Sequence, residues 1–336
     1  MKEIKKITFI GSGAWASALG NVVADNGYDV CIYGIAEDEI NDINNNHMNS
    51  KYCGKVILNT NITATLDLTY GVKDADIIVI AVPSSVIAGV ISNIIPLLSS
   101  KPIIVNVTKG FERKTKKTMV EYISSLIDSS LISGVVSLIG PSFAEEVVRK
   151  QYTAIAASST DVNAASIVQK VFSNHYFRVY TNSDVIGSEV CASLKNVIAL
   201  ASGILTGLGF ENNSHAALIT RGLGEITRFV VRVGGMEQTC LGLTGIGDLV
   251  LTCSSPKSRN YEAGVIIGSK GIRLFKEHNI KTVDGIYACE LAYKLGNEHN
   301  IYIPIITALY NVIFNEVDPL DEINSLMNGS LKSEMV

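Results

Sequence analysis

The first turn of the chain constrains its fold more than any other segment. The apolar run Ile7–Ile10 leads directly into Gly11-Ser12-Gly13-Ala14-Trp15-Ala16, and an apolar helical pattern follows over Ala18–Ala24. A strand, a G-x-G-x-x-A turn and a helix in that order are typical of a pyrophosphate-binding βαβ unit. Gly11 permits the tight turn, Gly13 lets the backbone approach a ligand, and the N–H groups at the helix start face the phosphates.

Composition excludes several classes of protein. At 336 residues, with 47% hydrophobic and 18% charged residues, the chain can bury a large core and form two domains. A net charge of −4 without a long Lys/Arg cluster gives no electrostatic basis for nucleic-acid binding. Apolar runs such as Ile77–Val82 are too short to span a membrane, and Met1–Lys6 does not resemble a signal peptide.

Cysteines and histidines show no pattern of metal ligation. The six cysteines contain no C-x-x-C pair, and the five histidines are dispersed. We therefore expect no metal site, and thiols in a reducing cytoplasm rather than disulfides.

Hydrophobic patterning divides the chain into two halves, residues 1–188 and residues 189–336. The first half alternates strands and helices, which favours an α/β doubly wound parallel sheet covered on both faces. We expect its strands at Ile4–Ile10, Val30–Tyr33, Ile77–Val82, Ile103–Val107, Val135–Ile139, Ala154–Ala157 and Phe177–Tyr180. We expect its helices to include Ser85–Leu98, Thr118–Ile127 and Ala164–Phe172.

The second half reads as mainly α-helical. Its helical patterns cover Glu189–Leu205, His215–Val233, Tyr261–Gly268 and Gly285–His299. No low-complexity linker separates the halves, so we expect them to pack closely with a ligand site in the crevice between them.

Polar residues follow three of the expected strands, at the sheet edge where α/β proteins bind ligands. Pro83-Ser84-Ser85 is a candidate wall of a cofactor site and equally a helix cap with Ser84 or Ser85 as N-cap, and the two interpretations are compatible. Lys109 in Thr108-Lys109-Gly110 points into the same crevice or is an ordinary solvated loop lysine. In Gly140-Pro141-Ser142, Ser142 can cap a helix with Glu145 three residues later, as in a capping box.

The helical half contains one lysine in an apolar helix, Lys195 between Leu194 and Val197. Burial of a lysine disfavours its charged form, which suits proton transfer. Snorkelling to the surface is the alternative. We favour Lys195 as a catalytic residue.

A second polar segment runs from Asp248 to Asn260. Asp248 and Thr252 are four residues apart and share one face if that segment is helical, although Asp248 also suits a plain N-cap. Ser258-Arg259-Asn260 opens the next helix, where an arginine opposes the helix dipole unless an anion binds there. Arg259 therefore indicates a phosphate site more than a surface position.

Together these segments resemble the bacterial-type NAD(P)-dependent glycerol-3-phosphate dehydrogenases over nearly the whole chain. The glycine turn, Val82–Val86, Thr108–Glu112 and Gly140–Glu146 match in the first half. Leu194–Ala199, Ala217–Leu223, Gly247–Cys253 and Ser258–Asn260 match in the second half. The resemblance implies a Rossmann domain followed by an all-α domain of the 6-phosphogluconate dehydrogenase C-terminal-like kind. It also implies reversible reduction of dihydroxyacetone phosphate to sn-glycerol 3-phosphate, the precursor of the phospholipid backbone, in a cytoplasmic homodimer.

The resemblance also implies a role for each matching residue. Lys195 is the proton donor and acceptor, with Lys109, Asp248 and Thr252 as the other catalytic residues. Substrate-contacting positions are Lys109, Gly140, Ser142, Lys195, Asp248, Ser258, Arg259 and Asn260. Cofactor-contacting positions are Gly11, Ser12, Gly13, Ala14, Trp15, Pro83, Lys109, Ala144, Arg259 and Asp284.

Three positions depart from the family pattern. Ala16 stands where Gly is common, Ile35 where many members have a polar or basic residue, and Asp284 where the family often has Glu. Because no acid or arginine ends the second strand, the sequence leaves NAD and NADP open, with Glu37 or Asp38 favouring NAD. Two other functions remain as alternatives: a 3-hydroxyacid or 6-phosphogluconate dehydrogenase, and a non-catalytic NAD(H)-binding sensor.

Overall fold

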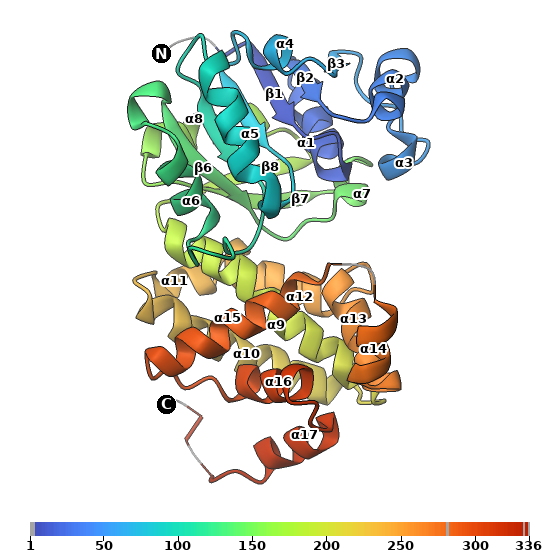
Figure 1. Cartoon of the computed structure of the whole chain (residues 1–336), viewed down its shortest axis with the longest axis vertical. Helices are drawn as coiled ribbons and strands as arrows, with labels where there is room; N and C mark the ends of the chain where they lie inside the picture. Colours follow the sequence, from blue (N-terminus) through green and yellow to red (C-terminus); the bar gives the residue numbers. More distant parts are fainter. Residues whose placement is uncertain (1–3, 280–281, 332, 335–336) are drawn as a thin grey trace. The chain divides into compact units, whose positions relative to one another are not determined.

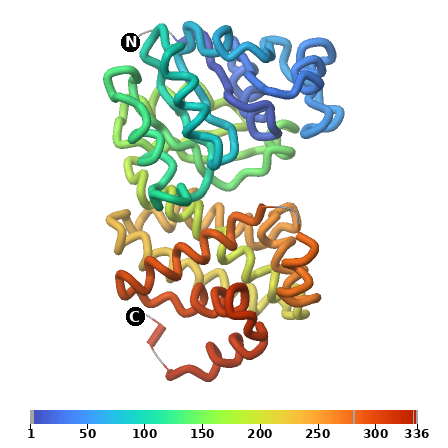
Figure 2. The backbone as a smooth tube through the Cα atoms, in the orientation of Figure 1, coloured from blue at the N-terminus to red at the C-terminus, as the bar shows by residue number. Residues whose placement is uncertain are grey.

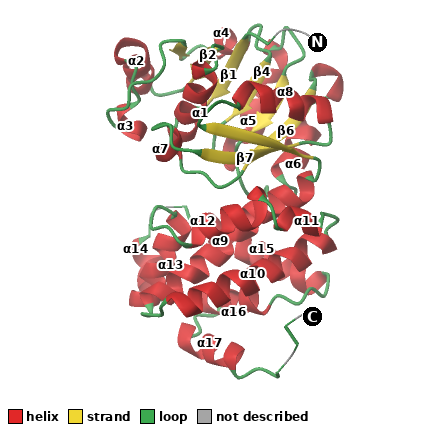
Figure 3. Cartoon of the chain, turned by 180° about the vertical axis from the view of Figure 1, so that it is seen from behind, coloured by secondary structure: helices red, strands yellow, loops and turns green. Residues whose placement is uncertain are grey.

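The computed structural model describes residues 4–279, 282–331 and 333–334. Residues 1–3, part of the segment compared with a signal peptide, lie outside this range. The chain divides into two compact units, Met1–Glu189 (unit 1) and Val190–Val336 (unit 2). Unit 1 is an α/β fold and unit 2 is helical (Figure 3).

The described part of unit 1 contains one eight-stranded sheet in the order β3-β2-β1-β4-β5-β6-β7-β8. The first six strands follow the order of a doubly wound dinucleotide-binding fold, whose switch point lies between β1 and β4. Strands β1 and β2 lie side by side in Figure 1. The strands are β1 (Lys6–Ile10), β2 (Asp29–Tyr33), β3 (Ile62–Thr65), β4 (Ile77–Ile80), β5 (Ile103–Asn106), β6 (Gly134–Ile139), β7 (Thr153–Ser158) and β8 (Phe177–Asn182).

Two features of the sheet differ from the expectation. Strand β3 was not expected; it is a four-residue edge strand that pairs with β2 alone. Strand β7 runs antiparallel to β6, so the sheet is mixed rather than wholly parallel. The link between these two strands holds only the four-residue helix α7 (Ala144–Val147), which replaces the long crossover helix typical of a parallel connection.

Helices cover both faces of the sheet, as the sequence predicted. Successive residues of β4 point to opposite faces: Val79 packs in a core with α1 and α8, and Ile78 packs in a core with α5 and α6. The helices of unit 1 are α1 (Ala14–Asp25), α2 (Glu37–Asn46), α3 (Ser50–Cys53), α4 (Leu68–Val72), α5 (Ile87–Ile94), α6 (Met119–Leu126), α7 and α8 (Val162–Phe172), with 3-10 turns at Ser84–Val86, Ile95–Leu97 and Ser129–Leu131.

Helix α9 (Val185–Gly207) begins at the end of unit 1 and continues through unit 2. The remaining helices are α10 (Asn212–Arg232), α11 (Glu237–Cys240), α12 (Asp248–Cys253), α13 (Arg259–Lys270), α14 (Ile272–His278), α15 (Asp284–Glu298), α16 (Pro304–Phe314) and α17 (Pro319–Met327), with a π-helical turn at Leu243–Gly247. Helices α13 and α14 fold back on one another as a hairpin, drawn in orange in Figure 2.

Helices α9 and α13 meet backbone to backbone through four glycines. A Cβ atom on Gly203 would lie 2.1 Å from the Tyr261 carbonyl oxygen. A Cβ atom on Gly264 would lie 2.1 Å from the Leu200 carbonyl oxygen, and Gly207 and Gly268 are similarly crowded. Only residues without a side chain allow this approach.

Helix α9 is long and apolar enough to cross a membrane by length and composition, with a mean hydropathy of 1.5. This helix was not recognised as a candidate span from the sequence, where only shorter apolar runs such as Ile77–Val82 were considered. However, 83% of its most apolar window is buried inside the protein, as in the core helix of a globular fold.

Candidate functional site

The glycine turn after β1 has the geometry of a phosphate cradle. Gly11 adopts φ +112°, and a Cβ atom there would lie 2.5 Å from the Ala81 carbonyl oxygen, so no larger residue fits. A Cβ atom on Gly13 would instead project into open space. Helix α1 begins at Ala14 without a side-chain cap, so its first N–H groups can bind an anion such as the pyrophosphate of a dinucleotide.

The Ser12 side chain is hydrogen-bonded within unit 1. Its hydroxyl donates to Glu39 Oε2 at 2.5 Å, and Lys51 Nζ lies 2.6 Å from Glu39 Oε1. Burial raises the pKa of Glu39, but the hydrogen bonds from Lys51 and Ser12 outweigh it and hold that pKa below its usual range. Glu39 was not predicted from the sequence, where its signal was an acid on the helix after β2.

The end of β2 carries neither of the usual ribose-binding groups. Ile35 is 87% exposed. Glu37 and Asp38 are exposed in the first turn of α2, where negative charge is favourable with the helix dipole.

The ends of β4 and β5 are joined by a hydrogen bond. The Thr108 hydroxyl donates to the Val82 carbonyl at 2.8 Å, and half-buried Lys109 follows Thr108. The prediction that Ser84 or Ser85 caps the next helix is wrong. Pro83 occupies the N-cap position of the 3-10 turn, and no side chain caps it.

The turn after β6 differs from the expected capping box. Ser142 Oγ donates back to the Gly140 carbonyl at 3.1 Å, and Phe143 rather than Ser142 precedes α7 without a side-chain cap. Gly140 is required by close packing, because a Cβ atom there would lie 2.7 Å from Ile155 Cα. Ala144 is the first residue of α7.

Unit 1 therefore places its candidate residues along one edge of the sheet. They follow the carboxyl ends of β1, β4, β5 and β6, which are neighbours in the sheet order. All four strands are parallel, so the turns that leave them lie at the same edge.

Lys195 is buried, as predicted, with 4% of its surface exposed. Its Nζ donates to Asp248 Oδ1 at 2.5 Å and to Thr252 Oγ1 at 2.8 Å. Asp248 and Thr252 share one face of α12, which confirms the prediction from their spacing. Asp248 is the first residue of α12 rather than its N-cap, and only 1% of it is exposed. The three side chains form a buried polar cluster that can hold and release a proton.

The start of α13 carries the predicted anion-binding residues. Ser258 is the N-cap and accepts a hydrogen bond from Tyr261 N at 3.3 Å. Asn260 is buried, and its Oδ1 accepts from Gly285 N at 2.8 Å. Arg259 is exposed, with Nη2 3.5 Å from Asp284 Oδ2. Unit 2 thus brings Arg259 together with Asp284, one of the three positions that depart from the family pattern.

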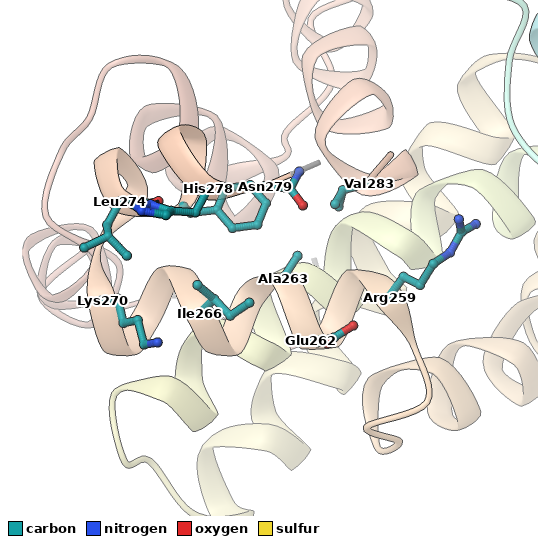
Figure 4. A pocket seen from close by; sticks show the side chains of 10 residues that line it. Arg259, Glu262, Ala263, Ile266, Lys270, Leu274, His278, Asn279 and Val283 are labelled. Carbon is teal, nitrogen blue, oxygen red and sulfur yellow. The ribbon is translucent and has the colours of Figure 1, made fainter. Parts of the chain in front are cut away.

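A groove of about 470 Å³ extends from Arg259 along α13 and α14 (Figure 4). Arg259 and Lys270 stand at its two ends, with apolar side chains such as Ala263 and Ile266 between them. Apart from Arg259, its lining contains none of the predicted site residues.

Other buried acids were not identified from the sequence, among them Glu189 on α9 and Glu225 on α10. Glu225 accepts hydrogen bonds from Ile305 N and Ile306 N, and burial raises its pKa to about 7. The signal that pointed to Lys195, a charge among apolar helix residues, was equally present at Glu189. All six cysteines lie in the described part of the chain, are buried and form no disulfide. No cluster of three or more possible metal ligands occurs among the described residues.

Comparison with known proteins gives matches over both units. Residues 6–165 match the family described as NAD-dependent glycerol-3-phosphate dehydrogenase N-terminus, and residues 184–324 match the corresponding C-terminus. Glycerol-3-phosphate dehydrogenase [NAD(P)+] from Staphylococcus saprophyticus is 44% identical over 333 residues, covering 98% of this chain and 100% of the relative. The Streptococcus pyogenes protein of the same name is 41% identical over 332 residues, covering 98% of both chains. The crystal structure of glycerol-3-phosphate dehydrogenase from Coxiella burnetii superimposes with a TM-score of 0.85 at 30% identity, covering 97% of this chain and 99% of that one.

Proposed function

Because the chain belongs to the NAD-dependent glycerol-3-phosphate dehydrogenase family, we propose that residues of units 1 and 2 divide the work of that reaction. The protein is an oxidoreductase that reversibly reduces the ketone of dihydroxyacetone phosphate to sn-glycerol 3-phosphate with NAD(H) or NADP(H). Its product supplies glycerophospholipid synthesis. Membership of this family argues against the two alternatives from the sequence, a 3-hydroxyacid or 6-phosphogluconate dehydrogenase and a non-catalytic NAD(H)-binding sensor.

Residues of unit 1 hold the dinucleotide, in the region 1–188 expected to bind it. Gly11, Gly13 and the N–H groups of Ala14 and Trp15 bind its pyrophosphate, as the open space beside Gly13 and the uncapped start of α1 support. Pro83 and Ala144 line the cofactor farther along the sheet edge, and Arg259 and Asp284 are the remaining residues assigned to cofactor contact. When bound, the nicotinamide exchanges a hydride with the substrate carbon.

Lys195 exchanges the proton, and the hydrogen-bonded cluster around its Nζ is the observation that carries this assignment. During reduction, Nζ donates a proton to the carbonyl oxygen as that oxygen gains negative charge, which is general acid catalysis. Asp248 and Thr252 orient Nζ. Lys109 stabilises the same oxygen electrostatically, and this stabilisation is greatest in the transition state.

Residues at the start of α13 hold the substrate phosphate. Arg259 offers paired N–H donors, and the N-terminus of α13 adds backbone N–H groups. Asn260 Oδ1 already accepts from Gly285, so its amide nitrogen is the group that donates to the phosphate. Ser258, Gly140 and Ser142 complete the substrate contacts.

A steady-state assay of reduced-nicotinamide absorbance tests the reaction, with dihydroxyacetone phosphate as substrate and NADH and NADPH in parallel. Rapid oxidation is expected, and the ratio of the two rates gives the cofactor preference. Absence of oxidation in a protein that binds the cofactor would contradict the proposal.

Lys109→Ala tests the unit 1 lysine, with Lys117→Ala as a matched control on the same loop. We expect kcat/KM to fall only in the first variant. Equal values of kcat/KM in the two variants would contradict a catalytic role for Lys109.

We further propose a homodimer that works in the cytoplasm. A reducing compartment suits six buried cysteines without a disulfide. Sedimentation equilibrium tests the oligomeric state, and a monomer at assay concentrations would refute the dimer.

A further inference from the structure

The loop over residues 107–118 leaves β5 and carries Lys109. Phe111 and Thr118 form an antiparallel bridge across it, and Glu112 N donates to the Lys117 carbonyl at 2.9 Å. The loop is therefore a small hairpin with two stems, one after Asn106 and one before α6. The position of Lys109 depends on how these two stems are held.

Asn106 holds the first stem. It is fully buried at the end of β5, its Oδ1 accepts from Thr108 N at 3.0 Å, and its Nδ2 donates to the Thr108 carbonyl at 2.9 Å. The side chain of Asn106 thus fixes the backbone one residue before Lys109.

Glu189 contacts both stems with one carboxylate. Its Oε1 accepts from Asn106 Nδ2 at 3.2 Å and from the Ser137 hydroxyl at 2.7 Å. Its Oε2 accepts from Val120 N at 2.9 Å, in the first turn of α6, which directly follows the second stem. Only 3% of Glu189 is exposed.

The partners of this carboxylate, over the described residues, are neutral donors. Burial raises the pKa of Glu189, while the hydrogen bonds from Val120, Ser137 and Asn106 oppose that rise. A buried acid without a cationic partner costs stability, and simple packing of a helix on a sheet does not require one. The position of Glu189 between the two stems of the loop provides a reason for a buried acid at this place.

We propose that Glu189 is a positioning residue that fixes both stems of the loop 107–118 and thereby holds Lys109 where it acts. Its effect on catalysis rests on the proposed role of Lys109. Its effect on the loop does not depend on that role.

The chemistry of the carboxylate suggests a sharp substitution, Glu189→Gln. The amide retains the size of the side chain but replaces one acceptor oxygen by an N–H₂ donor. Either orientation then turns that donor toward Asn106 Nδ2 or toward Val120 N, so one stem loses its acceptor. Glu225→Gln is the matched control, because Glu225 is another buried glutamate that accepts backbone N–H groups, but in unit 2.

The first test is a double-mutant cycle on kcat/KM. We expect Glu189→Gln to lower kcat/KM about tenfold in the natural chain and far less in the Lys109→Ala background, because contacting residues couple. Glu225→Gln should have the same effect in both backgrounds. An equal loss from Glu189→Gln in both backgrounds would overturn the catalytic part of the inference.

The second test is hydrogen exchange of the loop, which does not depend on activity. Glu189→Gln should speed amide exchange over residues 107–120 and leave the amides of β1 unchanged, whereas Glu225→Gln should not affect the loop. Unchanged exchange in the loop would refute the inference outright. If Lys109→Ala alone has full activity, the proposed role of Lys109 fails, and exchange still decides whether Glu189 holds the loop. Glu189→Asp, too short to reach both stems, is the second variant if Glu189→Gln does not fold.

Discussion

Replacing Lys195 by methionine should separate the catalytic work of the buried cluster from its contribution to stability. Lys195 and Asp248 side chains are 6% and 1% exposed, so the substitution leaves a buried carboxylate without its bonded cation. Breaking one partner of a buried ion pair costs about 3–5 kcal/mol. Loss of a general acid lowers the rate by about 10²–10⁴-fold. We therefore expect Lys195→Met to lose both stability and kcat.

The double variant Lys195→Met/Asp248→Asn distinguishes the two losses. It removes the carboxylate charge that no longer faces Lys195, so most of the lost stability should return, while kcat stays low because no proton donor is restored. Urea denaturation measures the free energy of unfolding, and the absorbance of reduced nicotinamide at saturating substrate measures kcat.

Cofactor affinity provides the internal control, since the glycine turn is in unit 1 and Lys195 is in unit 2. The dissociation constant for NADH should change little in both variants. A Lys195→Met enzyme with kcat within tenfold of the natural enzyme would refute the assignment of the proton donor. A double variant as unstable as the single one would refute the charge argument.

Three other predictions follow from single positions. Gly13→Ala should fold normally, because its Cβ would meet open space, but it should weaken NADH binding, measured by fluorescence titration. An unchanged affinity for NADH would contradict pyrophosphate binding at that turn. Arg259→Ala should raise KM for dihydroxyacetone phosphate by about 10- to 150-fold, as expected for a charged hydrogen bond worth 1.5–3 kcal/mol, whereas Arg273→Ala, another exposed arginine of unit 2, should not. Burial raises the pKa of Glu225 from 4.5 to about 7, so the folded state keeps this proton to higher pH than the unfolded state; stability should fall by about 3 kcal/mol as pH rises through that window. Urea denaturation of the natural chain and Glu225→Gln across pH 4–8 checks this, and parallel pH profiles would contradict it.

The central strands and long helices were predictable because their signals are strong and local. Strands β1, β4 and β5 are continuous apolar runs buried on both faces, and their predicted bounds differ by one or two residues from those observed. Strand β3 was missed because an edge strand of four residues with two apolar side chains resembles a loop. The reversed direction of β7 depends on how the chain returns after Gly140, which strand composition does not encode.

The residues of the candidate site also divide into those with a strong local signal in the sequence and those without one. Lys195 stood out as a charge in an apolar helix, and the spacing of Asp248 and Thr252 placed them on one face. The serine caps failed because a serine hydroxyl can bond several nearby carbonyls with similar energy, and Ser142 bonds Gly140 instead of the helix start. The contacts of Glu189 with Asn106 and Val120 join residues 83 and 69 positions apart, and no local pattern reports such a pairing.

The four-glycine contact between α9 and α13 has a consequence for engineering this enzyme. Helix α9 carries Lys195 and α13 begins at Arg259, so the contact fixes the spacing between the proposed proton donor and the proposed phosphate-binding residue. Because backbone atoms set the distance between the two helices, exchanging side chains elsewhere on them leaves that distance unaltered. A designer who wants a longer substrate must therefore rebuild the turn before α13 rather than respace the helices.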